Sequence, residues 1–200
     1  MTPEPGNKPQ PLSTLERLLK VAVWIFGSAL MLVAVTVSVE VVLRQIFDFG
    51  SIIGIEYSGY ILAVSSAFAF PFTLLKRGHV RVDFIKFVSP RIEIFADMLA
   101  ILSMLFLAIC LTVFAFGVFS QSLSLGAVSS SPLETPLWLP QGLWFLGLLV
   151  FSLIAAVVLF AALFKLLRGE IADASALIST PSIKEEIEEV AHDWSVDEKD

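Results

Sequence analysis

The sequence predicts an all-α integral membrane protein that crosses the bilayer four times, with both termini on the cytoplasmic side. Of its 200 residues, 56% are hydrophobic and only 16% are charged, and the mean hydropathy is +0.85. Soluble domains carry about 25% charged residues. A chain of this size could not hide so much apolar surface inside a water-soluble core. The surplus of hydrophobic residues is therefore expected to face lipid.

Four long stretches of the chain carry no charged residue, over 21–39, 57–75, 98–133 and 135–164. A helix needs about 20 apolar residues to cross the hydrocarbon core, so we expect one span in each stretch. Between the third and fourth spans, the Ser-, Gly- and Pro-containing outer loop 120–136 is expected to break any helix. The predicted helices run roughly over 17–47, 54–76, 90–121 and 137–167.

Local signals mark the ends of these helices. Ser13 and Glu16 match a capping box that leads into the first helix. Pro71 predicts a kink near the end of the second helix, and Pro90 suits the first position of the third. Two tryptophans flank the outer start of the fourth helix, where indole rings favour the interface: Trp138 and Trp144.

Basic residues predict the orientation. All but one of the 13 Lys and Arg residues lie in the N-terminal segment, the loop between the second and third spans, or the C-terminal segment. In a four-span protein these three regions share one side of the membrane, and only Arg44 lies toward the other. Because Lys and Arg concentrate in cytoplasmic loops, both termini are expected to be cytoplasmic.

Two segments outside the spans have amphipathic spacing. In the loop after the second span, Val80, Phe84, Phe87 and Val88 share one helical face, which is typical of a short interfacial helix. The four-helix domain covers residues 1–168, and 169–200 form an acidic cytoplasmic tail in which 182–194 has the spacing of one amphipathic helix. This tail helix either docks on a protein partner or is simply solvated, and we favour the solvated tail.

Two charged residues lie near the end of the first span. Glu40 and Arg44 are four residues apart, with the acid first, which favours a pair within the helix. At about 1.5 Å per residue, Glu40 lies roughly 30 Å and Arg44 roughly 36 Å from Lys20, so both sit at the outer boundary of a core about 30 Å thick. They either snorkel to water or pair with another membrane subunit, and we favour pairing because otherwise both must lie beside lipid. Glu56 opens the second helix, where a carboxylate suits the helix dipole.

The sequence offers no pattern that indicates an enzyme. The lone Cys110 excludes an intrachain disulfide, and the two histidines, His79 and His192, lie outside the spans, which excludes a haem held by paired intramembrane imidazoles within this chain. Neither a Gly-rich phosphate loop nor a zinc-binding spacing occurs, and no basic cluster suggests nucleic-acid binding. We therefore expect no cofactor, no metal and no catalytic residue in this chain.

The second span and the loop after it resemble a known family. The segment IEYSGYILAVSSAFAFPFTLLKRGHVRVDFI is similar to the small membrane subunit (DctQ-like) of TRAP transporters, the tripartite ATP-independent periplasmic systems. In that family a glutamate opens the second helix and a Gly-His-(Ile/Val)-Arg-Val-Asp segment follows it on the cytoplasmic side. The matching positions here are Glu56, Gly78, His79, Val80, Arg81, Val82 and Asp83. Further similarity, within roughly 15–168, lies at Arg44, Phe47, Pro136, Trp138 and Pro140.

The resemblance implies an accessory permease subunit of a sodium-coupled symporter in the cytoplasmic (inner) membrane of a bacterium or archaeon. Such a subunit forms a stable complex with a large membrane subunit, which holds the sodium and substrate sites. A periplasmic binding protein delivers the solute transiently, commonly a carboxylate or sulfonate. Sodium is therefore expected at the large subunit and not at this chain.

The GHVRVD segment has a structural interpretation. Gly78 allows a sharp turn, while His79 and Asp83 are expected to hydrogen-bond and fix the loop beneath the membrane. The alternatives are that His79 is a solvated loop residue or, least favoured, that it takes part in proton movement. Two other functions remain open for the whole chain. One is a stand-alone four-helix membrane scaffold, and the other is an interfacial membrane enzyme that acts through Arg44, Arg81 or Glu56 on a lipid or thiol substrate.

Overall fold

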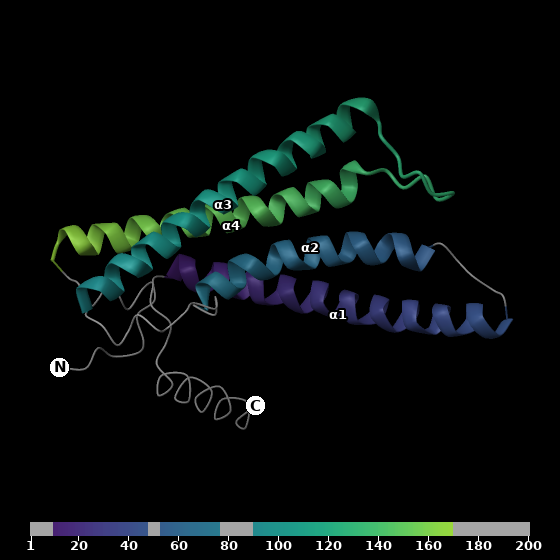
Figure 1. Cartoon of the computed structure of the whole chain (residues 1–200), viewed down its shortest axis with the longest axis horizontal. Helices are drawn as coiled ribbons and strands as arrows, with labels where there is room; N and C mark the ends of the chain where they lie inside the picture. Colours follow the sequence, from purple (N-terminus) through teal and green to yellow (C-terminus); the bar gives the residue numbers. More distant parts are fainter. Residues whose placement is uncertain (1–9, 48–52, 77–89, 170–200) are drawn as a thin grey trace, which may run out of the picture.

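The part of the chain that the structure describes folds into four helices, whose arrangement is drawn in Figure 1. The computed structural model describes residues 10–47, 53–76 and 90–169. Its helices are α1 (Gln10–Phe47), α2 (Ile53–Leu75), α3 (Pro90–Leu125) and α4 (Trp138–Leu167). All four are long and apolar enough to cross a membrane, which confirms the predicted fold class. The predicted interfacial helix and the tail helix 182–194 lie outside the described residues.

The helices alternate in direction, so the bundle has two distinct ends (Figure 1). One end gathers the starts of α1 and α3 and the ends of α2 and α4, and we call it the basic end. Its described Lys and Arg residues are Arg17, Lys20, Lys76, Arg91, Lys165 and Arg168. The opposite end, the loop end, holds the segment 126–137 that joins α3 to α4. At the basic end, Lys76 Nζ lies 3.2 Å from Glu16 Oε1 and ties the end of α2 to α1.

The start of α1 differs from the prediction. The helix begins at Gln10 rather than near residue 17, so Ser13 lies inside it and does not cap its start. Pro11 falls in the first turn, where the missing N–H group has no helical acceptor to lose. Pro90 is the first residue of α3, as predicted.

The end of α3 also differs from the prediction, because the helix runs to Leu125 rather than to residue 121. Serine hydroxyls within the last turns donate back to backbone carbonyls of the helix, from Ser120 to Gly117 (3.0 Å) and from Ser124 to Gln121 (2.9 Å). Local hydrogen bonds of this kind let serine remain helical. The helix ends before Gly126, whose φ of 58° suits a residue without a side chain.

The bundle consists of two helical hairpins joined along one seam. α1 packs on α2, α3 packs on α4, and α2 contacts α4; no other pair of the described helices brings its backbones within 8 Å of each other. The larger buried cluster consists of Leu19, Leu74, Ile101, Ala108, Phe151, Ile154, Ala155 and Ala162. A second cluster, nearer the loop end, consists of Ala67, Ala115 and Leu148. Trp138 is the first residue of α4, and Trp144, less than two turns further on, packs partly buried against this second cluster; their predicted place at the membrane interface stays a prediction.

The seam between α2 and α4 is a close backbone contact. A Cβ atom added to Gly147 would lie 2.7 Å from the Ala67 Cβ and 3.1 Å from the Ala67 carbonyl oxygen. That carbonyl has lost its helical donor, because Pro71, four residues on, has no N–H group. The Gly147 backbone covers the exposed carbonyl, so Gly147, Ala67 and Pro71 together bring the two hairpins into contact.

Each hairpin is also held by a polar contact inside its apolar interface. Thr112 Oγ1 lies 2.7 Å from Ser152 Oγ, and both hydroxyls lie within hydrogen-bond distance of the Leu148 carbonyl. Between α1 and α2, the Ser65 hydroxyl donates to the Phe26 carbonyl at 3.0 Å. Hydroxyl groups commonly link helices inside membranes, each contributing about 0.6 kcal/mol on average.

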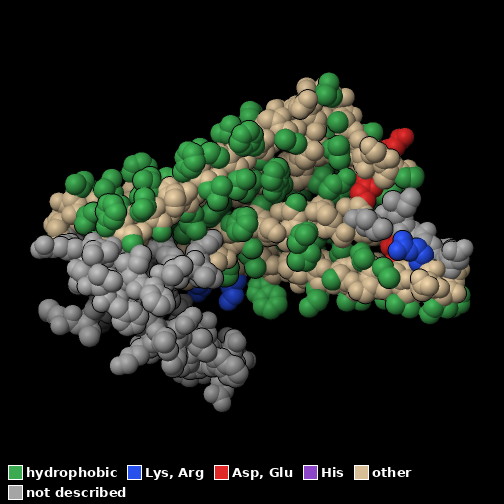
Figure 2. Space-filling model, viewed as in Figure 1, with side chains coloured by type: hydrophobic (Ala, Val, Ile, Leu, Met, Phe, Trp, Pro, Cys, Tyr) green, Lys and Arg blue, Asp and Glu red, His purple; other side chains and the backbone are tan. Residues whose placement is uncertain are grey.

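The outer surface of the bundle is apolar. Where the described residues are visible, Figure 2 shows many hydrophobic side chains on the surface and only a few charged ones, which lie toward the right-hand end and beside the grey atoms. The helices differ in how much of them the bundle covers. In an 18-residue apolar stretch of each helix, 6% of the residues are buried in α1, against 39% in α4.

Candidate functional site

The seven residues singled out in the sequence fall into two groups. Three of them, Glu40, Arg44 and Glu56, lie at the loop end. The other four lie outside the described residues, so the interpretation of that segment stays a prediction: Gly78, His79, Arg81 and Asp83. The candidate site is therefore the loop end, where α1, the start of α2 and the segment 126–137 meet.

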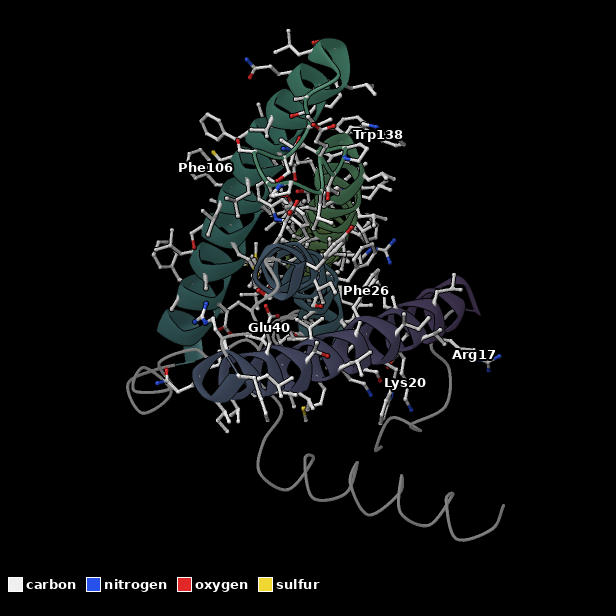
Figure 3. The ribbon with its side chains drawn as sticks, turned by 90° about the vertical axis from the view of Figure 1, so that its right-hand side faces the viewer. Arg17, Lys20, Phe26, Glu40, Phe106 and Trp138 are labelled. Carbon is white, nitrogen blue, oxygen red and sulfur yellow. The ribbon has the colours of Figure 1, made fainter. Side chains whose placement is uncertain are left out.

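Glu40 contacts another helix of its own chain. Its half-buried carboxylate lies directly against the first turn of α2, because a Cβ atom added to Gly54 would collide with Glu40 Oε2. The first turn of a helix presents N–H groups without helical acceptors and the positive end of the helix dipole, and both attract an anion. Figure 3 shows Glu40 on the side of α1 that faces α2. Gly54 supplies the space for this contact.

Arg44 does not form the predicted helical pair with Glu40. Its side chain is exposed, and it makes no hydrogen bond or ion pair with any residue of the three described stretches. The acid that should have paired with it is directed to α2 instead. Arg44 is therefore a cation on an otherwise apolar helix end, facing away from the packed interior.

Glu56 faces the segment that joins α3 to α4. Tyr60, one turn further along α2, donates its hydroxyl to Glu56 Oε1 at 3.0 Å. The hydroxyls of Ser129, Ser131 and Thr135 lie close to the same carboxylate. Oε2 is buried and, among the described residues, accepts no hydrogen bond of ordinary geometry. Glu56 thus links the first hairpin to the loop of the second.

The segment 126–137 has a defined backbone conformation. Val128 and Pro136 form an antiparallel bridge, which is closed by hydrogen bonds from Ser129 N–H to the Thr135 carbonyl (2.9 Å) and from Leu137 N–H to the Ala127 carbonyl (3.0 Å). These bonds make a short, closed loop directly above Glu56. The sequence predicted a loop here but did not predict its shape or its contact with α2.

Sequence reasoning missed the residues that connect the helices. Tyr60 could have been found, because it lies four residues after Glu56 and therefore on the same helical face. Thr112 and Ser152 could have been suspected as hydroxyls within apolar spans, but their pairing depends on how α3 packs against α4. Across the described stretches, no group of three or more His, Cys, Asp or Glu side chains is placed to hold a metal ion.

These features define a small polytopic membrane protein, built from two packed hairpins with a charged loop end and a lipid-facing surface. Comparison with protein families identifies it further. The chain belongs to the DctQ family, the DctQ component of tripartite ATP-independent periplasmic transporters, whose family model matches residues 31–168. No curated protein and no solved structure matched the chain. Membership of this family makes the chain a membrane component of a TRAP transporter.

Proposed function

We propose that this chain is the small, non-catalytic permease subunit of a sodium-coupled TRAP symporter in the cytoplasmic (inner) membrane of a bacterium or archaeon. Its role is to brace the large membrane subunit, which carries the sodium and substrate sites. A periplasmic binding protein delivers an organic acid to the assembled pair. The family match supports the assignment to a transporter. The separate roles of the small and the large membrane subunit follow from the resemblance of the sequence to small TRAP subunits.

The observation that carries the proposal is the exposure of α1. Among the described helices only α2 brings its backbone within 8 Å of α1, and 6% of the residues in an 18-residue apolar stretch of α1 are buried. In a self-sufficient four-helix bundle each helix packs against its neighbours around a shared core. A span held by a single neighbour leaves most of its surface for a second membrane protein, as expected of an accessory subunit.

We further propose that the basic end is cytoplasmic and the loop end periplasmic. The described cations at the basic end include Arg17, Lys20 and Lys165, and such residues concentrate on the cytoplasmic side. The closed segment 126–137 then faces the periplasm, on the side from which a binding protein would approach.

Uptake of a labelled organic acid tests the function. Cells without their own transporter for that acid are given this chain, the large subunit and the binding protein together, and then each combination that lacks one component. We expect uptake driven by a sodium gradient only when all three are present. Uptake by this chain alone, or undiminished uptake after its omission, would contradict the proposal.

A further inference from the structure

The last two turns of α1 project from the bundle, and all of their seven residues except Arg44 and Gln45 are apolar. All residues from 41 to 47 are exposed, and the exposed fraction is 54% for Val42, 67% for Ile46 and 69% for Phe47. We call residues 41–47 the projecting end of α1. A helix surface that is mostly apolar is normally covered by protein or by the hydrocarbon of a membrane.

Lipid hydrocarbon does not extend far enough to cover the projecting end. The uncharged part of α1, residues 21–39, spans about 28 Å at 1.5 Å per residue, which matches a hydrocarbon core of about 30 Å. Measured from Lys20, Ile46 lies about 39 Å and Phe47 about 40 Å along the helix. Both side chains therefore stand beyond the core, where an exposed apolar patch indicates a contact with another protein.

Arg44 makes this surface suited to a partner that carries a carboxylate. Its guanidinium lies among the apolar residues of the projecting end and has no partner among the described residues, since Glu40 is directed to the first turn of α2. Guanidinium groups bind carboxylates through paired hydrogen bonds. A surface with one arginine surrounded by aliphatic and aromatic side chains fits a partner that presents one carboxylate in an apolar setting.

We propose that the projecting end of α1 is a contact surface for the large TRAP membrane subunit, and that Arg44 binds a carboxylate of that subunit near the periplasmic boundary of the membrane. This inference rests on the proposed function and adds the location and chemistry of the interface. Glu40, which the sequence analysis placed in the same interface, is assigned instead to the start of α2.

Photo-crosslinking locates the contact directly. The photoreactive analogue benzoylphenylalanine replaces either Phe47 or Phe114, both exposed phenylalanines, at 69% and 73%. Phe114 lies on α3 and serves as the matched control. After illumination of membranes that hold both subunits, we expect a crosslink to the large subunit from position 47 and at least about fivefold less from position 114. Equal crosslinking at both positions, or only lipid adducts at position 47, would overturn the proposal.

Charge variants test the role of Arg44. Arg44→Gln is expected to lower the amount of this chain that co-purifies with a tagged large subunit about tenfold, the scale of one interfacial charge pair, at equal levels in the membrane. Arg17→Gln, an exposed arginine at the other end of the same helix (Figure 3), should leave the yield unchanged. Arg44→Lys should restore part of it.

The remaining outcomes separate this inference from the proposed function. An equal loss of yield for Asp48→Asn, which removes the acid four residues further along the sequence, would assign Arg44 to a pair within its own chain and overturn the inference. If the wild-type chain binds the large subunit but position 47 does not crosslink, the inference alone fails. If the wild-type chain does not bind at all, the proposed function fails with it.

Discussion

At the level of single residues, Gly147 is a position that leaves no room for a side chain. The seam between the hairpins depends on it, because its missing side chain lets α4 approach the Ala67 backbone of α2. Glycine usually costs helix stability. Here the close approach offsets that cost, as in other membrane helix pairs where small residues bring backbones together.

Gly147→Ala should therefore destabilise the fold, although alanine is the better helix former. The added Cβ atom would approach Ala67 to 2.7 Å, so one helix must move. We expect a loss of about 1–3 kcal/mol, as for other overpacked sites, measured by reversible denaturant unfolding in detergent micelles. Gly117→Ala is the control, since a Cβ at that helical position meets nothing within 4 Å. A Gly147→Ala variant as stable as the control would show that the seam is not tightly packed.

Glu40 and Arg44 also show which features could be predicted from the sequence and which could not. The distance of Glu40 and Arg44 from Lys20 placed both near the membrane boundary, and their spacing suggested a pair. The contact of Glu40 with Gly54 could not be read from the sequence, because it depends on how α2 folds back against α1. The segment around Gly78 and His79 lies outside the described residues, so its predicted role is untested.

At the level of elements, the four spans could be predicted because lipid imposes a length and a composition on them. The residues at which the helices begin and end were less predictable. Serine favours turns in isolation, which suggested an early end for α3, but Ser120 and Ser124 satisfy their hydroxyls within the helix and let it continue to Leu125. Contacts between elements, such as the one between Glu56 and the segment 126–137, depend on packing and were not predictable.

Glu56→Gln should loosen the segment 126–137 without unfolding the helices. Replacing the carboxylate with an amide removes the anion that Tyr60 and the nearby hydroxyls face. We expect hydrogen exchange at the amides of Ser129 and Leu137 to quicken about tenfold or more, since local opening exposes their hydrogen bonds. Exchange is followed by mass spectrometry.

The matched variant is Glu134→Gln, which changes an exposed acid in the same segment. It should leave exchange at these two amides as it is in the wild type. The same exchange rate in the Glu56 variant as in the wild type would mean that the segment is held by its own backbone bonds alone.

At the level of the whole molecule, the two hairpins have different apolar lengths. The uncharged parts of α1 and α2 each measure about 28 Å, while those of α3 (98–125) and α4 (138–164) measure about 42 and 40 Å. A hydrocarbon core of about 30 Å accommodates the first pair upright. The second pair must tilt to bury its full apolar length.

We therefore expect α3 and α4 to be tilted by about 40° from the membrane normal, and α1 and α2 by less than about 20°. Solid-state NMR of the segmentally labelled chain in aligned bilayers measures these angles. Tilts below about 20° for all four helices would mean that the bilayer thickens locally or that the ends of α3 and α4 lie outside it.

The central claim is that this bundle is incomplete by itself and is completed by a large membrane subunit. The most direct test is native mass spectrometry of the tagged chain, purified in mild detergent after co-expression with the large TRAP subunit. The account predicts one dominant species that contains one copy of each subunit. Recovery of this chain as a stable species alone, with no large subunit bound, would contradict it.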